Sequence, residues 1–436
     1  MSKGRAGSKQ AVLSRRGVLK GAAALAGAAA GSDAIGGFPT VWAQNIKDIT
    51  LINIGGSFEC IKQIADQAEK DLGFKVVMQA VDPATQLQRT LTQPRSFDVN
   101  YSDNSTITYL QGKGVVKPIN VKDYKLWDQT LPIFTDGKLP DGKPISNLGS
   151  SPLRSGFWDG PDGKKLAGKP TEWLTMVPTL FNADTLGVRP DLVGGKDVVT
   201  SWKDLIDPKY KGKAALNDQA QIGVMDAAMA LQANGDITYK NMGNMTRAEI
   251  DKTVDLMMKI KKSGQFRAFW TNFDESVNLM ASGEVVIQSM WSPAVTAVRA
   301  QGIPCYYAPL KEGYRGWYTG QTPMAHLSGL KLNCAMEYIN WFNSGWQGGF
   351  IAKQGYYSPV PSTAKKFLTQ AEWDYWYEGK PAATDIKDPF GNLIDKKGAV
   401  RDGGSLWERE GHIAVWNTVM DEDRYLTRRW IGFVAS

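Results

Sequence analysis

Apolar runs of two different periods alternate along the chain, and short Gly-containing turns separate them. Residues 49–54 (ITLINI) alternate between apolar and polar positions, as a half-buried strand does. Residues 58–72 carry apolar side chains at helical spacing, and Gly73 is placed to end that helix. Residues 75–80 (KVVMQA) predict the next strand. This order predicts a βαβ unit and therefore a parallel sheet.

The stretch 272–295 (NFDESVNLMASGEVVIQSMWSPAV) repeats the pattern and places a tryptophan after a strand. Asp274 is placed to cap a helix that Gly283 ends. Residues 285–287 form a β-branched run that suits a buried strand. Because ligands of open α/β sheets bind beyond the carboxyl ends of the strands, we expect Trp291 to line a ligand cleft where the chain changes lobes.

Three further segments complete the predicted organisation. Residues 97–101 predict a strand that runs into a Ser-Asp-Asn-Ser turn, where Asp103 either faces the cleft or only caps the following helix. Residues 172–182 are apolar and β-prone, and we expect them to cross into the second lobe. The tail, residues 362–436, is expected to be mostly helical.

The segment before the first strand is typical of an export signal. Residues 14–20 (SRRGVLK) resemble a twin-arginine motif, and an Ala- and Gly-rich stretch follows in residues 21–30. Residues 41–43 (VWA) form the best cleavage site. We therefore expect residues 1–43 to be a signal peptide. No other stretch reaches the ~20 apolar residues of a membrane span, so a soluble periplasmic protein is expected.

Most of the net positive charge of the chain comes from this segment. Residues 1–43 contain six of the 51 Lys and Arg residues but only one of the 44 Asp and Glu residues. The rest has 45 basic and 43 acidic residues, a net charge of +2 in place of +7. A nearly neutral chain has no electrostatic footprint for nucleic acid, so we expect no nucleic-acid partner.

Residue types that carry metal or nucleophile chemistry are scarce. The two histidines, His326 and His412, lie far apart and in no metal-binding spacing. The three cysteines, Cys60, Cys305 and Cys334, favour buried thiols over a disulfide framework, although export leaves one pairing possible. No G-x-S-x-G elbow occurs. We therefore predict no metal, no cofactor and no enzymatic activity.

Two alternative functions stay open at this point. A secreted hydrolase that uses a pair of carboxylates needs no histidine, and the chain has many acidic residues. An anion- or metal-ion-binding protein is the other alternative, because the Gly-Gly-Ser turn at residues 55–57 offers backbone N–H groups at a predicted helix start.

Aromatic residues give the positive functional signal. The chain has 15 Trp, 15 Tyr and 15 Phe residues. Several lie where strands end or loops turn: Tyr101, Trp173, Trp291, Trp317, Tyr318, Tyr356 and Tyr357. Such an arrangement suits a site that stacks on a small ligand or encloses a cation.

A series of segments resembles the periplasmic solute-binding proteins of ABC importers, and the spermidine/putrescine-binding-like group of family 1 extracellular solute-binding proteins in particular. The segments, in order, are DLGFKV, EWLTMVPTLFNADTLG, VTSWKDLIDPKYKGKAAL, SGEVVIQSMWSPAV, PLKEGYRGW, EYINWFNSG and GYYSPVP. The resemblance implies an α/β, two-lobed type II periplasmic binding-protein fold, in which each lobe is a sheet flanked by helices and a hinge joins the lobes. It also implies a monomer that closes on its ligand and then docks on a membrane permease.

The resemblance also gives the order of the lobes along the chain. Lobe 1 takes residues 44–171 and the return segment 291–328. Lobe 2 takes residues 172–290 and the return segment 329–436, which includes the C-terminal helices.

The resemblance supplies candidate ligand-binding residues. Trp291, Trp317 and Tyr356 match three aromatic residues that stack on the ligand in the polyamine-binding group. Other matches differ in type: Gly56 and Glu59 stand where that group has aromatics at a helix start, and Ser105 stands at about the position of a stacking tyrosine. Gln219 and Ile222 replace its paired acids, and Thr319 replaces a third acid.

A site without those acids is expected to exclude linear polyamines, because burying unpaired ammonium groups is costly. We therefore expect a small polar solute with a single amine or a quaternary ammonium. Asp103 and Glu59 are the candidate anchors for that cation, and the other polar groups are candidates for hydroxyls or a carboxylate. The complete candidate set is Gly56, Ser57, Glu59, Asp103, Asn104, Gln219, Trp291, Trp317, Thr319 and Tyr356.

Overall fold

A sheet of ten strands runs through the molecule in the computed structural model, which describes residues 46–436. Its main path has the order β2-β1-β3-β11-β6-β9-β7-β8, while β10 pairs with β6 and β14 pairs with β11. The strands are β1 (Thr50–Gly55), β2 (Lys75–Ala80), β3 (Val99–Asp103), β6 (Val177–Val188), β7 (Ala214–Asn217), β8 (Phe266–Trp270), β9 (Ile287–Met290), β10 (Tyr306–Tyr307), β11 (Tyr314–Pro323) and β14 (Ile413–Trp416). The expected signal peptide, residues 1–43, lies outside the described residues.

The first lobe is built on the parallel strands β1, β2 and β3. Its helices are α1 (Lys62–Leu72), α2 (Pro83–Thr92), α3 (Ile107–Leu110) and α11 (Gly329–Phe342). Helices α1 and α11 pack against each other, and their buried residues join those of β1 in one apolar cluster. The predicted βαβ unit is therefore confirmed.

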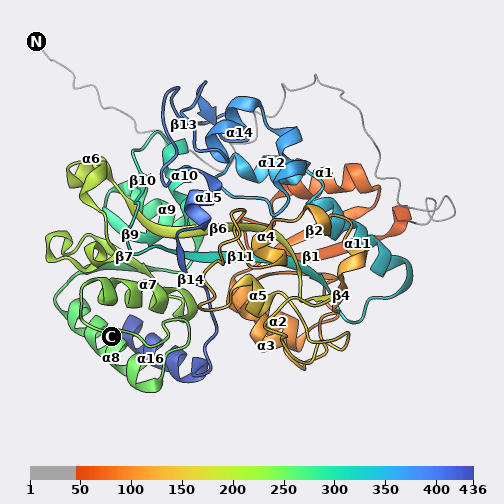
Figure 1. Cartoon of the computed structure of the whole chain (residues 1–436), viewed down its shortest axis with the longest axis horizontal. Coiled ribbons are helices and arrows are strands. Elements are labelled where there is room, and N and C mark those ends of the chain that lie inside the picture. Colours follow the sequence, from red (N-terminus) through yellow and green to blue (C-terminus); the bar gives the residue numbers. More distant parts are fainter. Residues whose placement is uncertain (1–45) are drawn as a thin grey trace, which may run out of the picture.

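The second lobe is built on β7, β8 and β9, which are also parallel to one another. Its helices are α6 (Pro190–Val193), α7 (Ala220–Ala233), α8 (Arg247–Lys262), α9 (Phe273–Ser282), α10 (Ser292–Ala300) and α16 (Asp423–Ala435). Helix α16 packs on α7 and α8, so the end of the described chain belongs to this lobe (Figure 1).

Two long strands pass from one lobe into the other. Strands β6 and β11 are antiparallel neighbours across the middle of the molecule (Figure 1). One end of β11 pairs with β3 of the first lobe, and the far end of β6 pairs with β9 of the second lobe. Every residue of both strands is buried, which is why the sequence of β6 lacks strict alternation. This architecture confirms the predicted two-lobed α/β fold with connecting strands.

The remaining elements are short and lie at the edges of the lobes. They are β4 (Ile119–Asn120), β5 (Trp173–Leu174), β12 (Ile386–Lys387), β13 (Leu393–Asp395), α4 (Pro132–Thr135), α5 (Pro152–Ser155), α12 (Trp346–Ala352), α13 (Pro361–Ala364), α14 (Gln370–Trp376) and α15 (Leu406–Glu410). No helix among residues 46–436 combines the length and the apolar character that crossing a membrane requires.

The predicted residue boundaries of the lobes stay a prediction. For the segment 329–436, packing favours a division between the lobes, because α11 contacts α1 and β1 whereas α16 contacts α7 and α8.

Three local predictions were wrong. The first helix begins at Lys62, not at residue 58, because the N–H of Cys60 donates to the carbonyl of Gly56 and closes a separate turn. Helix α9 is capped by Asn272, not by Asp274, through a capping box with Glu275. The tail is not mostly helical, because it contributes three strands, one of which joins the central sheet.

Candidate functional site

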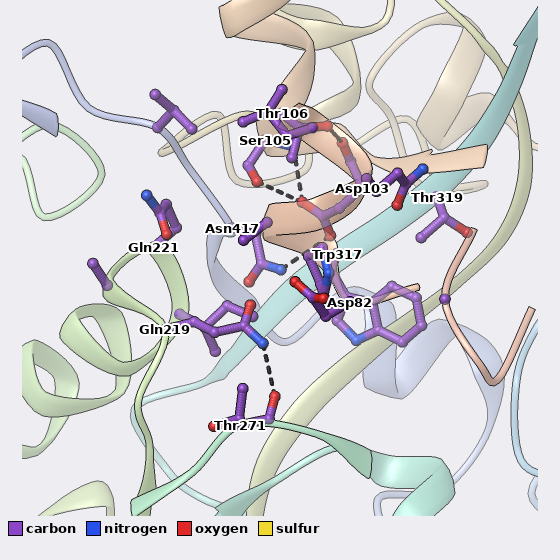
Figure 2. Close-up of a pocket in the computed structure, with 18 of the residues that line it drawn as sticks. Asp82, Asp103, Ser105, Thr106, Gln219, Gln221, Thr271, Trp317, Thr319 and Asn417 are labelled. Atoms are coloured by element: carbon purple, nitrogen blue, oxygen red, sulfur yellow. Dashed lines mark hydrogen bonds between the residues drawn. The ribbon is translucent and has the colours of Figure 1, made fainter. Parts of the chain in front are cut away.

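A pocket of about 370 Å³ lies between the two lobes, and both lobes line it. Its walls come from the loops after β1, β2 and β3, from β11, from the start of α7 and from the segment after β14. Figure 2 shows Asp103, Ser105 and Thr106 on one side of the pocket and Gln219 and Thr271 on the opposite side. The predicted position at the carboxyl ends of the strands is therefore where the pocket lies.

Eight of the ten candidate residues line this pocket: Gly56, Glu59, Asp103, Gln219, Trp291, Trp317, Thr319 and Tyr356. Ser57 and Asn104 are not among its lining residues. The Ser57 side chain is exposed. The Asn104 side chain is buried and donates to the carbonyl oxygen of Ser150 at 2.6 Å, while its own oxygen accepts from the N–H of Tyr318 at 3.2 Å. Asn104 therefore joins the loop at Ser150 to strand β11.

Asp103 both caps a helix and faces the pocket, so its two open interpretations are both correct. Its Oδ1 accepts from the backbone N–H of Ser105 at 2.9 Å and from the Ser105 hydroxyl at 2.6 Å. Its Oδ2 accepts from the Asn417 amide at 3.2 Å (Figure 2). Burial raises the pKa of Asp103, and these hydrogen bonds oppose that rise.

Glu59 lies deeper, with 2% of its surface exposed. Its Oε2 accepts from the backbone N–H of Gly56 at 2.8 Å, whereas its Oε1 has no hydrogen-bond partner among the described residues. Burial raises the pKa of Glu59 to about 8, and the nearby Asp103 carboxylate adds to the rise. In the turn that was predicted as an anion site, the Gly56 N–H therefore donates to Glu59, a carboxyl group of the chain itself.

Aromatic rings form the other wall of the pocket. Trp317 and Tyr356 are almost fully buried, and their ring centroids lie 6.1 Å apart. Trp291 is half-buried and packs edge-to-face on Trp270 at 4.9 Å. Phe58 lies between these rings and also lines the pocket. The expected shared hollow for Trp291, Trp317 and Tyr356 is present.

Two carboxylates that the sequence interpretation missed also line the pocket. Asp82 follows β2 and caps α2, where it accepts from the N–H and the hydroxyl of Thr85 at 2.9 and 2.6 Å. Those bonds lower its pKa. Asp218 follows β7 and accepts from the Thr271 hydroxyl at 2.6 Å, while burial raises its pKa. Both residues directly follow or nearly follow the carboxyl end of a parallel strand, and that position was the signal for finding them.

These two residues change the expected electrostatics of the site. The acids of the polyamine-binding group are absent at Gln219, Ile222 and Thr319, but four acids line the pocket from other positions: Glu59, Asp82, Asp103 and Asp218. No Lys, Arg or His is among the lining residues, all of which lie in the described part of the chain. Gln219, for its part, donates to the carbonyl of Thr271 at 2.9 Å and holds two second-lobe loops together.

A buried ionic network lies behind the pocket, where the connecting strands meet. Arg315 of β11 donates to Asp226 of α7 at 2.8 Å and to Asp184 of β6 at 3.4 Å. It also donates to the Asn417 oxygen at 2.6 Å, and Asn417 in turn donates to Asp103. Asp184 accepts from the backbone N–H of Ser292, next to Trp291. The network therefore links pocket residues of both lobes through the strands that connect them.

None of the described histidines or cysteines lines the pocket. All three cysteines are free thiols. His412 contacts the carbonyl of Leu310, and His326 lies 3.7 Å from Asp98. Within residues 46–436, no group of three or more His, Cys, Asp or Glu side chains is arranged to hold a metal ion.

The family described as "Bacterial extracellular solute-binding protein" matches residues 63–376. The chain belongs to this family. Its members bind solutes and are not enzymes, which confirms the predicted non-enzymatic function. The match includes parts of both lobes, both long connecting strands, Trp291 and Trp317, whereas β1, β14 and α16 lie outside it.

Individual relatives agree with this assignment. A spermidine/putrescine-binding periplasmic protein of Escherichia coli is 30% identical over 141 residues, which are 32% of this chain and 37% of the relative. A spermidine/putrescine ABC transporter substrate-binding protein of Streptococcus pneumoniae superposes with a TM-score of 0.58 at 13% identity, over 88% of this chain and 98% of that one. The Atu4243-GABA receptor superposes with a TM-score of 0.57 at 16% identity, over 89% and 98%. At these identities the two structures establish the fold alone.

Proposed function

We propose that this protein is the solute-binding component of an ABC importer and captures a small polar organic solute with an ammonium or quaternary ammonium group. One observation supports this most directly. Four carboxylates and five aromatic side chains line one pocket between the lobes, and no basic side chain joins them among the described residues. Such a surface repels an anionic solute and attracts a cationic one.

The energetics of an ammonium group favour this combination. A cation that leaves water needs a carboxylate or several acceptors to offset its desolvation. Asp82 is exposed and its hydrogen bonds favour the ionised form, so it keeps a negative charge at the pocket entrance. Aromatic faces add about 0.5–2 kcal/mol per cation contact. Spermidine, putrescine and GABA, which appear in the names of the relatives, all carry amino groups.

The way in which both lobes line the pocket suggests how the solute is delivered to a permease. A solute that contacts Asp103 and Trp317 on one side and Asp218 and Trp291 on the other stabilises the closed form of the two lobes. We propose that this closed form of a periplasmic monomer docks on the permease, and that the twin-arginine signal at residues 1–43 exports it. The family name, with its extracellular location, fits this route.

A thermal-shift screen tests the proposal. We expect amines, quaternary ammonium compounds and amino acids with a free amine to raise the melting temperature, because a ligand that binds only the folded state stabilises it. Sugars and dicarboxylic acids are expected to have no effect. Shifts caused by sugars or dicarboxylates, with none caused by cations, would show that the proposed ligand class is wrong.

Trp291→Ala is the variant that ties the shift to this pocket. We expect the fold to survive, because Trp291 is only half-buried, and we expect the shift by a binding cation to disappear. Trp173→Ala is the matched control, because Trp173 is also half-buried but does not line the pocket. A full shift in the Trp291 variant would place the binding site elsewhere.

A further inference from the structure

Phe58 occupies the centre of the aromatic wall, although nothing in the sequence singled it out. Its ring centroid lies 6.3 Å from that of Trp291, 6.2 Å from that of Trp317 and 6.0 Å from that of Tyr356. These three rings are the ones expected to stack on a solute. Phe58 lies next to all three of them, and its ring is nearly parallel to that of Tyr356, at 11°.

The turn between β1 and α1 holds Phe58 in this position. The Gly56 N–H donates to the Glu59 carboxylate at 2.8 Å, and the Cys60 N–H donates to the Gly56 carbonyl at 2.8 Å. A Cβ atom on Gly56 would lie 2.9 Å from Cε1 of Phe58. The absence of a side chain at Gly56 therefore allows the Phe58 ring to fold back over its own turn and toward the pocket.

Phe58 also joins the two lobes. It belongs to the first lobe, whereas Trp291 follows β9 of the second lobe. Their contact brings a ring of one lobe against a ring of the other at the aromatic end of the pocket. Phe58 is half-buried and lines the pocket, so its ring borders the space available to a solute in addition to packing on the core.

We propose that Phe58 is the end wall of the pocket and limits the length of the solute that the pocket accepts. This inference rests on the proposed function, a cationic solute in this pocket. It gives a different reason for a short solute from the one expected from the sequence, which was the absence of the acids of the polyamine-binding group. Four carboxylates line the pocket, so a lack of acids does not exclude a long diamine. The Phe58 ring, in contrast, lies between Trp291, Trp317 and Tyr356 and leaves no room there for a longer chain.

The experiment compares wild type with Phe58→Ala in isothermal titration with linear α,ω-diamines of three to eight methylene groups. The charge is the same throughout this series and only the length changes. We expect wild-type affinity to fall as the chain lengthens. In the Phe58→Ala protein we expect the optimum to move to longer diamines, with the affinity ratio of longest to shortest rising at least tenfold. Phe58→Trp is expected to weaken binding of every member.

Leu87→Ala is a comparison variant, because Leu87 is an apolar residue of α2 that lines the pocket outside the aromatic cluster. Because Leu87→Ala also enlarges the pocket, it shows what added space away from the aromatic rings does to the length profile. Phe273→Ala is the second control and should leave the length profile unchanged, because Phe273 is a half-buried ring that stacks on Trp291 at 6.2 Å but does not line the pocket. Melting curves establish that each variant is folded. The same length profile in Phe58→Ala and wild type would overturn the inference. Loss of all binding in a folded Phe58→Ala protein would also overturn it, since Phe58 would then be a stacking surface and not a limit.

Two further outcomes separate this inference from the proposed function. If the Phe58→Ala protein binds long diamines and wild type does not, the proposed function and this inference are both supported, because the Phe58 ring then blocks binding in wild type. If neither protein binds any diamine or quaternary ammonium, the proposed function fails and this inference fails with it.

Discussion

Glu59 has surroundings that oppose its ionisation while leaving one of its oxygens available. The carboxyl group is almost fully buried, Asp103 lies near it, and the Gly56 N–H donates to it at 2.8 Å. Burial raises its pKa from 4.5 to about 8. Most ligand-free molecules therefore hold a proton on Glu59 at neutral pH. An ammonium bound beside it favours the ionised form, so binding must release that proton.

We accordingly expect affinity for a cation to rise with pH up to about 8. The increase is at most about tenfold per pH unit, because one proton is exchanged. Choline is a suitable probe, since its charge does not titrate. Titrations at several pH values, in buffers of different ionisation enthalpy, measure both the affinity and the number of protons released. Glu59→Gln should remove the pH dependence, and a slope that persists in this variant would contradict the assignment.

The same pKa predicts how Glu59 affects stability. The folded state keeps the proton between pH 4.5 and about 8, where the unfolded chain has lost it. The free energy of unfolding therefore falls as pH rises through this window, by up to about 1.4 kcal/mol per pH unit for this group. Urea denaturation of Glu59→Gln should show that part of the slope removed.

Glu410 provides the matched control for both measurements. It is also buried, and its pKa is also raised to about 8 by burial, but it does not line the pocket. Glu410→Gln should therefore flatten the stability slope and leave choline binding unchanged. If both glutamine variants altered binding alike, the effect would be a general one of buried charge.

Some of the individual site residues could be predicted from the sequence, and others could not. Trp291 could be placed because a buried strand precedes it and a proline follows. Asp82 and Asp218 also follow strands but were missed. An aspartate at such a position can equally cap a helix or lie in a loop, and no sequence spacing distinguishes these roles from that of a pocket residue. Phe58 was missed for another reason: the Gly56 turn was interpreted as the first turn of a helix, which hides the direction of the ring.

Among the elements, β6 and β11 join the lobes, and their central contact is ionic. Arg315 of β11 is 1% exposed, and its two partners, Asp184 and Asp226, are fully buried. The sequence predicted a crossing strand over residues 172–182, since they are apolar and β-prone, and the strand that crosses is Val177–Val188. It could not show the partners of Arg315, because Asp184 and Asp226 are distant in sequence and meet only through the fold.

Arg315→Met should therefore destabilise the protein strongly. It leaves two carboxyl groups without their cation in the interior, and removing one partner of a buried pair costs about 3–5 kcal/mol. Urea denaturation measures this loss. Arg267→Met is the control, because Arg267 pairs with Glu284 at 2.7 Å with both side chains about half exposed, 53% and 50%. Such a pair contributes about 0–1 kcal/mol. Equal costs for the two variants would show that the buried network does not stabilise the connection.

On the scale of the whole molecule, a second contact holds the lobes together beside the pocket. The Tyr109 hydroxyl of α3, in the first lobe, donates to Oδ2 of Asp423, the first residue of α16 in the second lobe. Gln221 of α7 donates to Oδ1 of the same carboxylate at 3.0 Å. Tyr109 and Gln221 line the pocket, whereas Asp423 does not. Asp423 therefore joins the two lobes without lining the pocket.

Asp423→Ala tests whether this contact sets the balance between open and closed forms. Hydrogen bonds to a charged group contribute about 1.5–3 kcal/mol, so losing them should lower the closed population, and with it the apparent affinity, about tenfold or more. Small-angle scattering should give a larger radius of gyration for the ligand-free variant than for wild type, and saturating ligand should restore the wild-type value. Asp421→Ala is the control, because Asp421 pairs only with Asn244 of its own lobe among the described residues. A ligand-free variant as compact as wild type, with unchanged affinity, would mean that closure depends on the solute and the connecting strands alone.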